Sequence, residues 1–167
     1  SHARVYVNGK EAGYWPYGYN SFHVDATPYL KPGEVNELAV RLENENESSR
    51  WYPGAGLYRN VHLVVTEDAY VPTWGTYVTT PVVNEKYAKV VLNTKLATAK
   101  GTDRSAYRIV TEIKDPNGKI VAKEENKLSV YNECQFEQEF AVATPALWSV
   151  ENPFLYTAES KIYAGNT

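Results

Sequence analysis

The chain has 167 residues, enough for one large or two small domains, and its hydrophobic share of 43% with a charged share of 22% excludes an intrinsically disordered protein. Its formal net charge of −3 offers no basic surface to nucleic acid or to an anionic membrane face. No apolar stretch approaches the ~20 residues of a membrane-spanning helix, so the sequence predicts a soluble protein that binds neither nucleic acid nor membrane.

The aromatic content favours β-structure. The chain contains 14 Tyr, 4 Trp and 4 Phe, and flat side chains pack well on the pleated surface of a sheet. No 11-residue window has a convincing helical period, which predicts an essentially all-β chain. The single cysteine, Cys134, excludes a disulfide within the chain and is interpreted as a small buried hydrophobic residue.

The first segment is predicted to form a β-hairpin. Residues 4–7 and 10–14 are the two strands, and Asn8-Gly9 between them suits a type I′ turn, in which both central residues need a positive φ. The aromatic run at residues 14–19 contains Pro and Gly, which break regular structure, so it is predicted to lie in a loop.

Two more strands are predicted in the next part of the chain. Residues 21–24 form a short one, and Asp25 caps a turn that leads to a reversal at residues 31–33. Residues 36–42 alternate between apolar and polar side chains, which is typical of a half-buried strand.

A domain boundary is predicted near Glu67, dividing the chain into residues 1–67 and 68–167. Residues 43–49 are polar and predict a solvated loop, and residues 60–66 predict another strand. Five short strands in about 67 residues cannot close two sheets with both inner faces covered. Either the chain starts inside a larger sandwich, or a second copy or a partner covers the exposed face, which predicts a homodimer through residues 1–67 as one solution.

The second segment has the strand spacing of a sandwich. Alternating runs and turn signals recur at residues 75–79, 87–97, 107–114, 120–124, 127–131, 134–142 and 155–163. The second and sixth runs each have one apolar face, and these faces are predicted to be the facing layers of the core. The residues of these two faces are Ala88, Val90, Leu92, Thr94 and Leu96, and Cys134, Phe136, Gln138, Phe140 and Val142.

About 100 residues with this pattern suit an immunoglobulin-like topology, although the Cys-Trp-Cys hallmark of antibody domains is missing. The turn between the third and fourth runs is predicted at DPNG (115–118), where Pro presets φ and Gly accepts a positive φ.

Four sequence phrases occur in a characteristic order: VYVNGK (5–10), GYNSF (18–22) with DAT (25–27), NELAVR (36–41) and RWYPGAGLYRNV (50–61). They resemble the later half of the sugar-binding, galactose-binding-like jelly roll of glycoside hydrolase family 2, which contains β-galactosidases and β-glucuronidases. The second segment is similar to the immunoglobulin-like domain of that family, and its phrase LWSVENPFLY (147–156) is similar to the ending before the family's TIM barrel.

The resemblance implies that the two catalytic glutamates lie in that TIM barrel, which this chain has no room to contain. No catalytic residue is therefore predicted here, and Glu43, Glu45 and Glu47 are interpreted as part of a solvated connection. His2, His23 and His62 are far apart with no ligand spacing, so neither a metal site nor a cofactor is predicted.

Two groups of residues are candidates for a contributory site. The resemblance implies that Ser49, Arg50 and Trp51 point toward the mouth of the barrel, where they either help to line the substrate cleft or seal the joint between domains. The rings of Trp15, Tyr17 and Tyr19 are interpreted either as an interface with a neighbouring domain or as a platform for a sugar.

The sequence thus predicts a partial jelly-roll sandwich followed by an immunoglobulin-like β-sandwich, acting as a non-catalytic region of a bacterial β-galactosidase. Its partner is the TIM-barrel domain of the same polypeptide, and a periplasmic or secreted location of the parent fits. Two alternatives remain open. One is an independent carbohydrate-binding module, and the other is an extracellular adhesion or scaffold protein built of tandem sandwiches.

Overall fold

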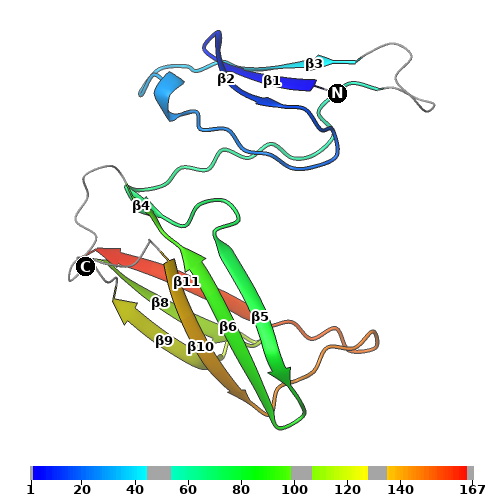
Figure 1. Ribbon diagram of the computed structural model, residues 1–167, viewed down its shortest axis with the longest axis vertical. Coiled ribbons are helices and arrows are strands. Elements are labelled where there is room, and N and C mark those ends of the chain that lie inside the picture. The colour runs from blue at the N-terminus through cyan, green and yellow to red at the C-terminus, as the bar shows by residue number, and fades with distance from the viewer. Residues whose placement is uncertain (1, 45–53, 99–106, 128–134, 165–167) are drawn as a thin grey trace. The chain divides into compact units, whose positions relative to one another are not determined.

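The computed structural model describes residues 2–44, 54–98, 107–127 and 135–164 (Figure 1). The chain divides into two compact units, Ser1–Leu63 and Val64–Thr167. Regular structure in the described ranges is β-strand, apart from one turn of 3-10 helix, η1, at Thr27–Tyr29. The predicted all-β class is therefore confirmed.

The first unit contains a three-stranded antiparallel sheet. Its strands are β1 (His2–Val7), β2 (Lys10–Trp15) and β3 (Leu38–Glu43), in the order β2-β1-β3. Asn8 and Gly9 join β1 to β2 with φ angles of 51° and 78°, as the type I′ turn requires. The predicted hairpin and the predicted third strand are both confirmed.

The central strand β1 buries every second side chain. Ala3, Val5 and Val7 are buried, and the residues between them are only partly covered. Val5 lies opposite Val40 of β3 and opposite Gly13 of β2. One face of the sheet thus forms the small core of this unit, because side chains alternate between the two faces of a strand.

Local hydrogen bonds shape the two turns predicted between β2 and β3. Asp25 Oδ1 accepts a bond from the Thr27 backbone N–H at 2.9 Å. Gly33 has a φ of 77° and follows Pro32, and the Glu34 backbone N–H donates to the Lys31 carbonyl at 3.2 Å. This is the pattern of a type II turn, so both predicted turns are confirmed.

Two predicted strands are wrong. Residues 21–24 and 60–66 have strand-like sequences, but neither pairs with a strand in the described part of the chain. A strand needs a neighbour for its backbone N–H and C=O groups, which sequence alternation cannot supply. In the second of these segments Val61, Leu63 and Val65 are 63%, 78% and 83% exposed.

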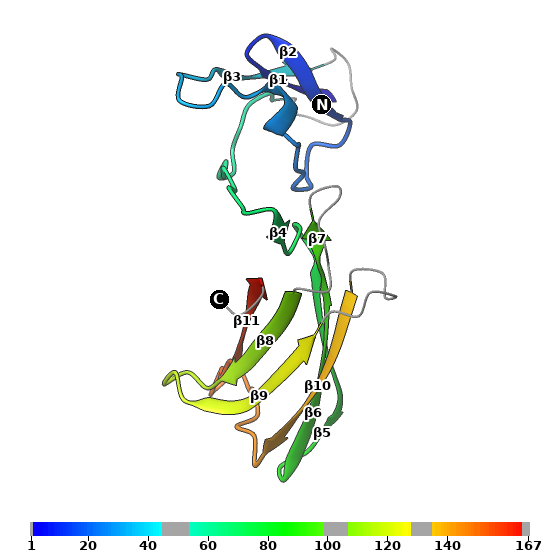
Figure 2. The same cartoon turned by 90° about the vertical axis from the view of Figure 1, so that its left-hand side faces the viewer.

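The second unit is a sandwich of two three-stranded antiparallel sheets with a short two-stranded addition, β4-β7. The sheet orders are β10-β6-β5 and β11-β8-β9, and Figure 2 shows them as two layers. The strands are β4 (Ala69–Tyr70), β5 (Thr76–Val83), β6 (Tyr87–Lys95), β7 (Ala97–Thr98), β8 (Tyr107–Lys114), β9 (Ile120–Lys127), β10 (Gln135–Ala143) and β11 (Thr157–Ala164).

Six of the seven strands predicted for this segment are present with small shifts of their ends. The remaining one, predicted at residues 127–131, cannot be compared, because residues 128–131 lie outside the described ranges. Its first residue, Lys127, is the last residue of β9. The DPNG turn is confirmed between β8 and β9: Gly118 has a φ of 80°, and its backbone N–H donates to the Asp115 carbonyl at 2.9 Å.

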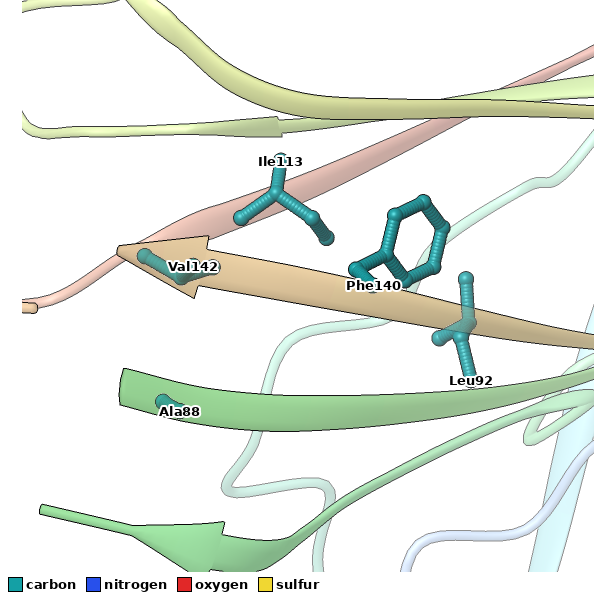
Figure 3. Close-up of a cluster of buried hydrophobic side chains, with 5 residues drawn as sticks. All are labelled: Ala88, Leu92, Ile113, Phe140 and Val142. Carbon is teal, nitrogen blue, oxygen red and sulfur yellow. The ribbon is translucent and has the colours of Figure 1, made fainter. Parts of the chain in front are cut away.

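The core of the sandwich corrects one expectation. The two apolar faces assigned to opposite layers belong to β6 and β10, which are neighbours in the same sheet, with Phe140 opposite Val90. The facing layer comes from β8, whose Ile113 belongs to one buried cluster with Phe140 and Leu92 (Figure 3). Alternation identifies the buried face of each strand but not the strand that covers it, because that depends on how the sheets stack.

Candidate functional site

The aromatic loop after β2 begins with a ring that the structure uses for packing. Trp15 ends β2 opposite Ala3, and its indole stacks on Phe22 with ring centroids 5.8 Å apart and planes within 9°. Both rings are half-buried. Within the described residues, Nε1 of Trp15 is buried without a hydrogen-bond partner. Trp15 therefore packs its ring on Phe22 at the end of the sheet.

The other two predicted rings are open to solvent. Tyr17 and Tyr19 are 55% and 72% exposed, and they meet edge to face with centroids 5.7 Å apart. Edge-to-face pairs are a favoured aromatic geometry, so the two rings support each other. The structure thus separates the predicted trio of Trp15, Tyr17 and Tyr19 into one packing ring and one exposed pair.

A further tyrosine, not assigned to the site from the sequence, reaches this loop. The Tyr58 hydroxyl donates to the Gly18 carbonyl at 3.4 Å, and the guanidinium of Arg59 lies 5.3 Å from the Tyr58 ring centroid. Tyr58 is 65% exposed. The sequence feature that could have indicated Tyr58 is its place in the phrase RWYPGAGLYRNV (50–61), which begins with the candidates Arg50 and Trp51. Tyr17, Tyr19 and Tyr58 are named here the tyrosine surface.

The tyrosine surface offers ring faces and phenol hydroxyls, and the neighbouring Arg59 adds a guanidinium. These groups bind by stacking and hydrogen bonding. The other predicted group, Ser49, Arg50 and Trp51, lies outside the described residues, so its contribution to a cleft stays a prediction. Glu43, the described member of the acidic stretch, pairs with Arg41 at 3.2 Å and is thus part of an ordinary ion pair.

Two carboxylates of the second unit stand directly opposite each other. Glu112 of β8 and Glu159 of β11 are register partners. Lys114 bridges them, with its Nζ 3.4 Å from Glu112 Oε2 and hydrogen-bonded to Glu159. Lys123 Nζ lies 2.9 Å from Glu112, and Lys161 Nζ lies 2.9 Å from Glu159. Like charges that face each other across strands are destabilising, and these lysines offset that repulsion.

The same lysines favour the ionised form of both carboxyl groups. Hydrogen bonds from Lys114 and Lys161 lower the pKa of Glu159 to about 2, and the hydrogen bond from Lys123 lowers the pKa of Glu112. A glycosidase of the retaining type needs one carboxyl group with a raised pKa to protonate the leaving oxygen. Glu112 and Glu159 are therefore ionised members of a surface network.

The residues that the structure describes contain no group of three or more His, Cys, Asp and Glu side chains that could hold a metal ion. His2 forms a hydrogen bond with the Tyr14 hydroxyl, and the two rings stack with centroids 5.9 Å apart. In the described ranges, no helix is long and apolar enough to cross a membrane.

Comparison with known proteins gives concordant matches. The family model described as glycosyl hydrolases family 2 matches residues 69–167. The β-galactosidase BoGH2A of Bacteroides ovatus is 42% identical over 96% of this chain, and a protein of Formosa agariphila named putative β-glucuronidase is 34% identical over 98%. The crystal structure of a glycosyl hydrolase family 2 member from Bacteroides cellulosilyticus superimposes on 99% of this chain with a TM-score of 0.91 and 35% identity.

In each of these matches the chain is a small part of the other protein. It spans 19% of BoGH2A, 15% of the Formosa agariphila protein and 23% of the solved structure. The all-β arrangement described above is thus found within much longer chains.

Proposed function

Because the chain belongs to family 2 of the glycosyl hydrolases, we propose that it works as a non-catalytic accessory region of a longer glycosidase. The observation that carries this proposal is the match to BoGH2A, which spans 96% of this chain but only 19% of that enzyme. The described carboxylates agree with it, since Glu112 and Glu159 are held ionised by lysines.

The parent enzyme is proposed to hydrolyse terminal β-galactosides. Support comes from the 42% identity to a β-galactosidase, against 34% to the protein named putative β-glucuronidase of Formosa agariphila. A direct assay of the full-length parent on a β-galactoside and a β-glucuronide tests this specificity.

The role of the accessory region is proposed to be positional. The two-sheet sandwich of the second unit is proposed to be an immunoglobulin-like spacer that holds a TIM-barrel domain of the same polypeptide. The first unit is proposed to be the end of a sugar-binding jelly roll. Support comes from its single covered sheet face and from the exposed apolar side chains of residues 60–66, which an isolated domain would bury.

A chromogenic assay tests the proposal. The 167-residue chain is expected to turn over neither a β-galactoside nor a β-glucuronide, whereas the full-length parent is expected to cleave the galactoside faster. Glu159→Gln in the isolated chain is the matched control for a contaminating activity. Turnover by the isolated chain that disappears in this variant would show a catalytic acid here and refute the accessory role.

A second function is favoured by the tyrosine surface. The exposed rings of Tyr17 and Tyr19 suit an independent carbohydrate-binding module, because open aromatic faces bind the apolar faces of sugars. Calorimetric titration of the chain with galactose and short β-galactosides separates the two functions. Affinity that is lost in Tyr17→Ala and kept in Tyr77→Ala, which alters a 67% exposed ring of the second unit, would favour the binding module.

Association of two isolated chains through residues 1–67 is proposed as well. The exposed side chains of Val61, Leu63 and Val65 provide the apolar surface, and the unpaired segment provides backbone groups for a neighbouring strand. Light scattering is expected to show a dimer that dissociates when all three are replaced by Ser. A clean monomer at high concentration of the unaltered chain would count against this association.

A further inference from the structure

The loop that joins β10 to β11, residues 144–156, is fixed by its own hydrogen bonds. The Ala146 backbone N–H donates to the Tyr156 hydroxyl at 2.9 Å. Ser149 N–H donates to the Asn152 carbonyl at 3.0 Å, and Asn152 N–H donates back to Ser149 Oγ at 3.0 Å. Phe154 N–H also donates to the Asn152 carbonyl, at 2.8 Å. The loop therefore holds one defined shape.

This rigid loop turns large apolar side chains toward solvent. Leu147, Trp148, Val150 and Leu155 are 43%, 58%, 80% and 68% exposed. Glu151 is the single charged residue of the loop sequence TPALWSVENPFLY. Apolar side chains gathered on an ordered, nearly uncharged loop are typical of an interface with another folded surface.

The loop lies at one end of the sandwich. Thr144 N–H donates to the Lys86 carbonyl at 2.9 Å, which fixes the loop beside the start of β6. The first strand of this unit, β4, pairs with β7 just beyond the other end of β6. A nine-residue strand spans about 30 Å, so the loop (orange in Figure 1) and β4 lie at opposite ends of the sandwich.

Building on the accessory role proposed above, we propose that the 144–156 loop is the surface by which this sandwich docks on the catalytic domain of the same polypeptide, with Trp148 as the anchor. The length of a relative supports this partner: the match spans 19% of BoGH2A, so that enzyme has about five times the sequence matched here, enough for a further domain. A preformed loop loses little conformational entropy on docking, and a central tryptophan is the side chain that most often dominates such contacts.

Hydroxyl-radical footprinting compares the 167-residue chain with the full-length parent. Trp148 is expected to be labelled several-fold less in the parent, because the catalytic domain shields its ring. Equal labelling of Trp148 in both proteins would overturn the proposal. Protection of Trp148 in the isolated chain that grows with protein concentration would also overturn it, since the occupant would then be a second copy.

A pair of variants gives an independent readout. Trp148→Ser is expected to lower the thermal midpoint of the parent while leaving that of the isolated chain unchanged, because the ring is exposed in the isolated chain. Tyr77→Ser is the matched control, as Tyr77 is 67% exposed on β5, and it is expected to shift neither midpoint. An unchanged midpoint for the Trp148→Ser parent would refute the docking role. Neither readout depends on the substrate, so the docking role and the proposed glycosidase activity can fail separately.

Discussion

Thr111 Oγ1 of β8 donates a hydrogen bond to Gln138 Oε1 of β10 at 2.6 Å, joining the two sheets of the sandwich. Both side chains are buried. Because the single hydroxyl proton of Thr111 is used in this bond, its contact with Ser160 Oγ at 2.8 Å must be donated by Ser160. Gln138 Nε2 in turn donates to Asn126 Oδ1 at 2.9 Å. A polar network thus links β8, β9, β10 and β11 inside the core.

Removing the Thr111 hydroxyl is expected to destabilise the sandwich. Thr111→Val leaves Gln138 Oε1 buried without its donor, which costs about 1–3 kcal/mol of unfolding free energy. Urea unfolding followed by tryptophan fluorescence measures the loss. The double variant Thr111→Val with Gln138→Leu is expected to lose less unfolding free energy than the sum of the losses of the two single variants, because each single variant breaks the same bond. Strict additivity would show that the two side chains do not interact.

For a second buried threonine, Thr94, removal of the hydroxyl is expected not to lower the unfolding free energy. Thr94 of β6 is fully buried like Thr111, but within the described residues its Oγ1 has no hydrogen-bond partner. Thr94→Val replaces a costly buried hydroxyl with a methyl group of similar shape. The variant is expected to be neutral or about 1 kcal/mol more stable in the same urea experiment. A loss as large as that of Thr111→Val would reveal a partner for Thr94 that lies outside the described residues.

The first unit depends on a glycine with no room for a side chain. A Cβ added at Gly13 would lie 2.8 Å from Cγ2 of Val24. Gly13→Ala is therefore expected to destabilise the chain by about 1–3 kcal/mol through overpacking. Val24→Ala in the same chain should recover part of the loss by removing the clashing methyl groups.

Gly56→Ala is the control for this experiment, because nothing lies within 4 Å of a Cβ at that position. Its thermal unfolding is expected to match that of the unaltered chain. Equal effects of Gly13→Ala and Gly56→Ala would contradict the tight contact between Gly13 and Val24.

The lysine-bridged glutamates predict how stability depends on pH. Hydrogen bonds from Lys114 and Lys161 lower the pKa of Glu159 from an ordinary value of 4.5 to about 2 in the folded chain. A carboxyl group with a lowered folded pKa stabilises the fold above its unfolded pKa and loses that contribution as the pH falls through the folded one. The stabilisation by Glu159 is thus expected near neutral pH and is lost between pH 4.5 and about 2.

Glu159→Gln tests this dependence. The unaltered chain is expected to have the higher denaturant midpoint near neutral pH, and the two midpoints are expected to converge as the pH is lowered through this window. Because the group is on the surface, high salt should narrow the difference at neutral pH. A difference that is the same at every pH would assign the effect of the substitution to packing.

The sequence by itself determined the local structure that short-range rules control. Residue types that favour particular turns account for the positive φ angles at Asn8 and Gly9. They also account for the turn at residues 115–118. The buried face of β10 followed from its alternation, and Phe136, Gln138 and Phe140 are buried as predicted. Each of these features depends on neighbours a few positions away in the chain.

Only the tertiary structure decided which strand covers which face and which aromatic rings stay open. The polar partners of Gln138 come from Thr111 and Asn126, on strands that no periodicity connects to β10. Trp15 and Tyr19 belong to one aromatic run, yet the first packs on Phe22 and the second is open to solvent. These outcomes depend on contacts between segments far apart in sequence, and the strand predicted at residues 60–66 is absent for the same reason. A local pattern favours the extended conformation, whereas the ladder that makes it a strand needs a second chain segment at its side.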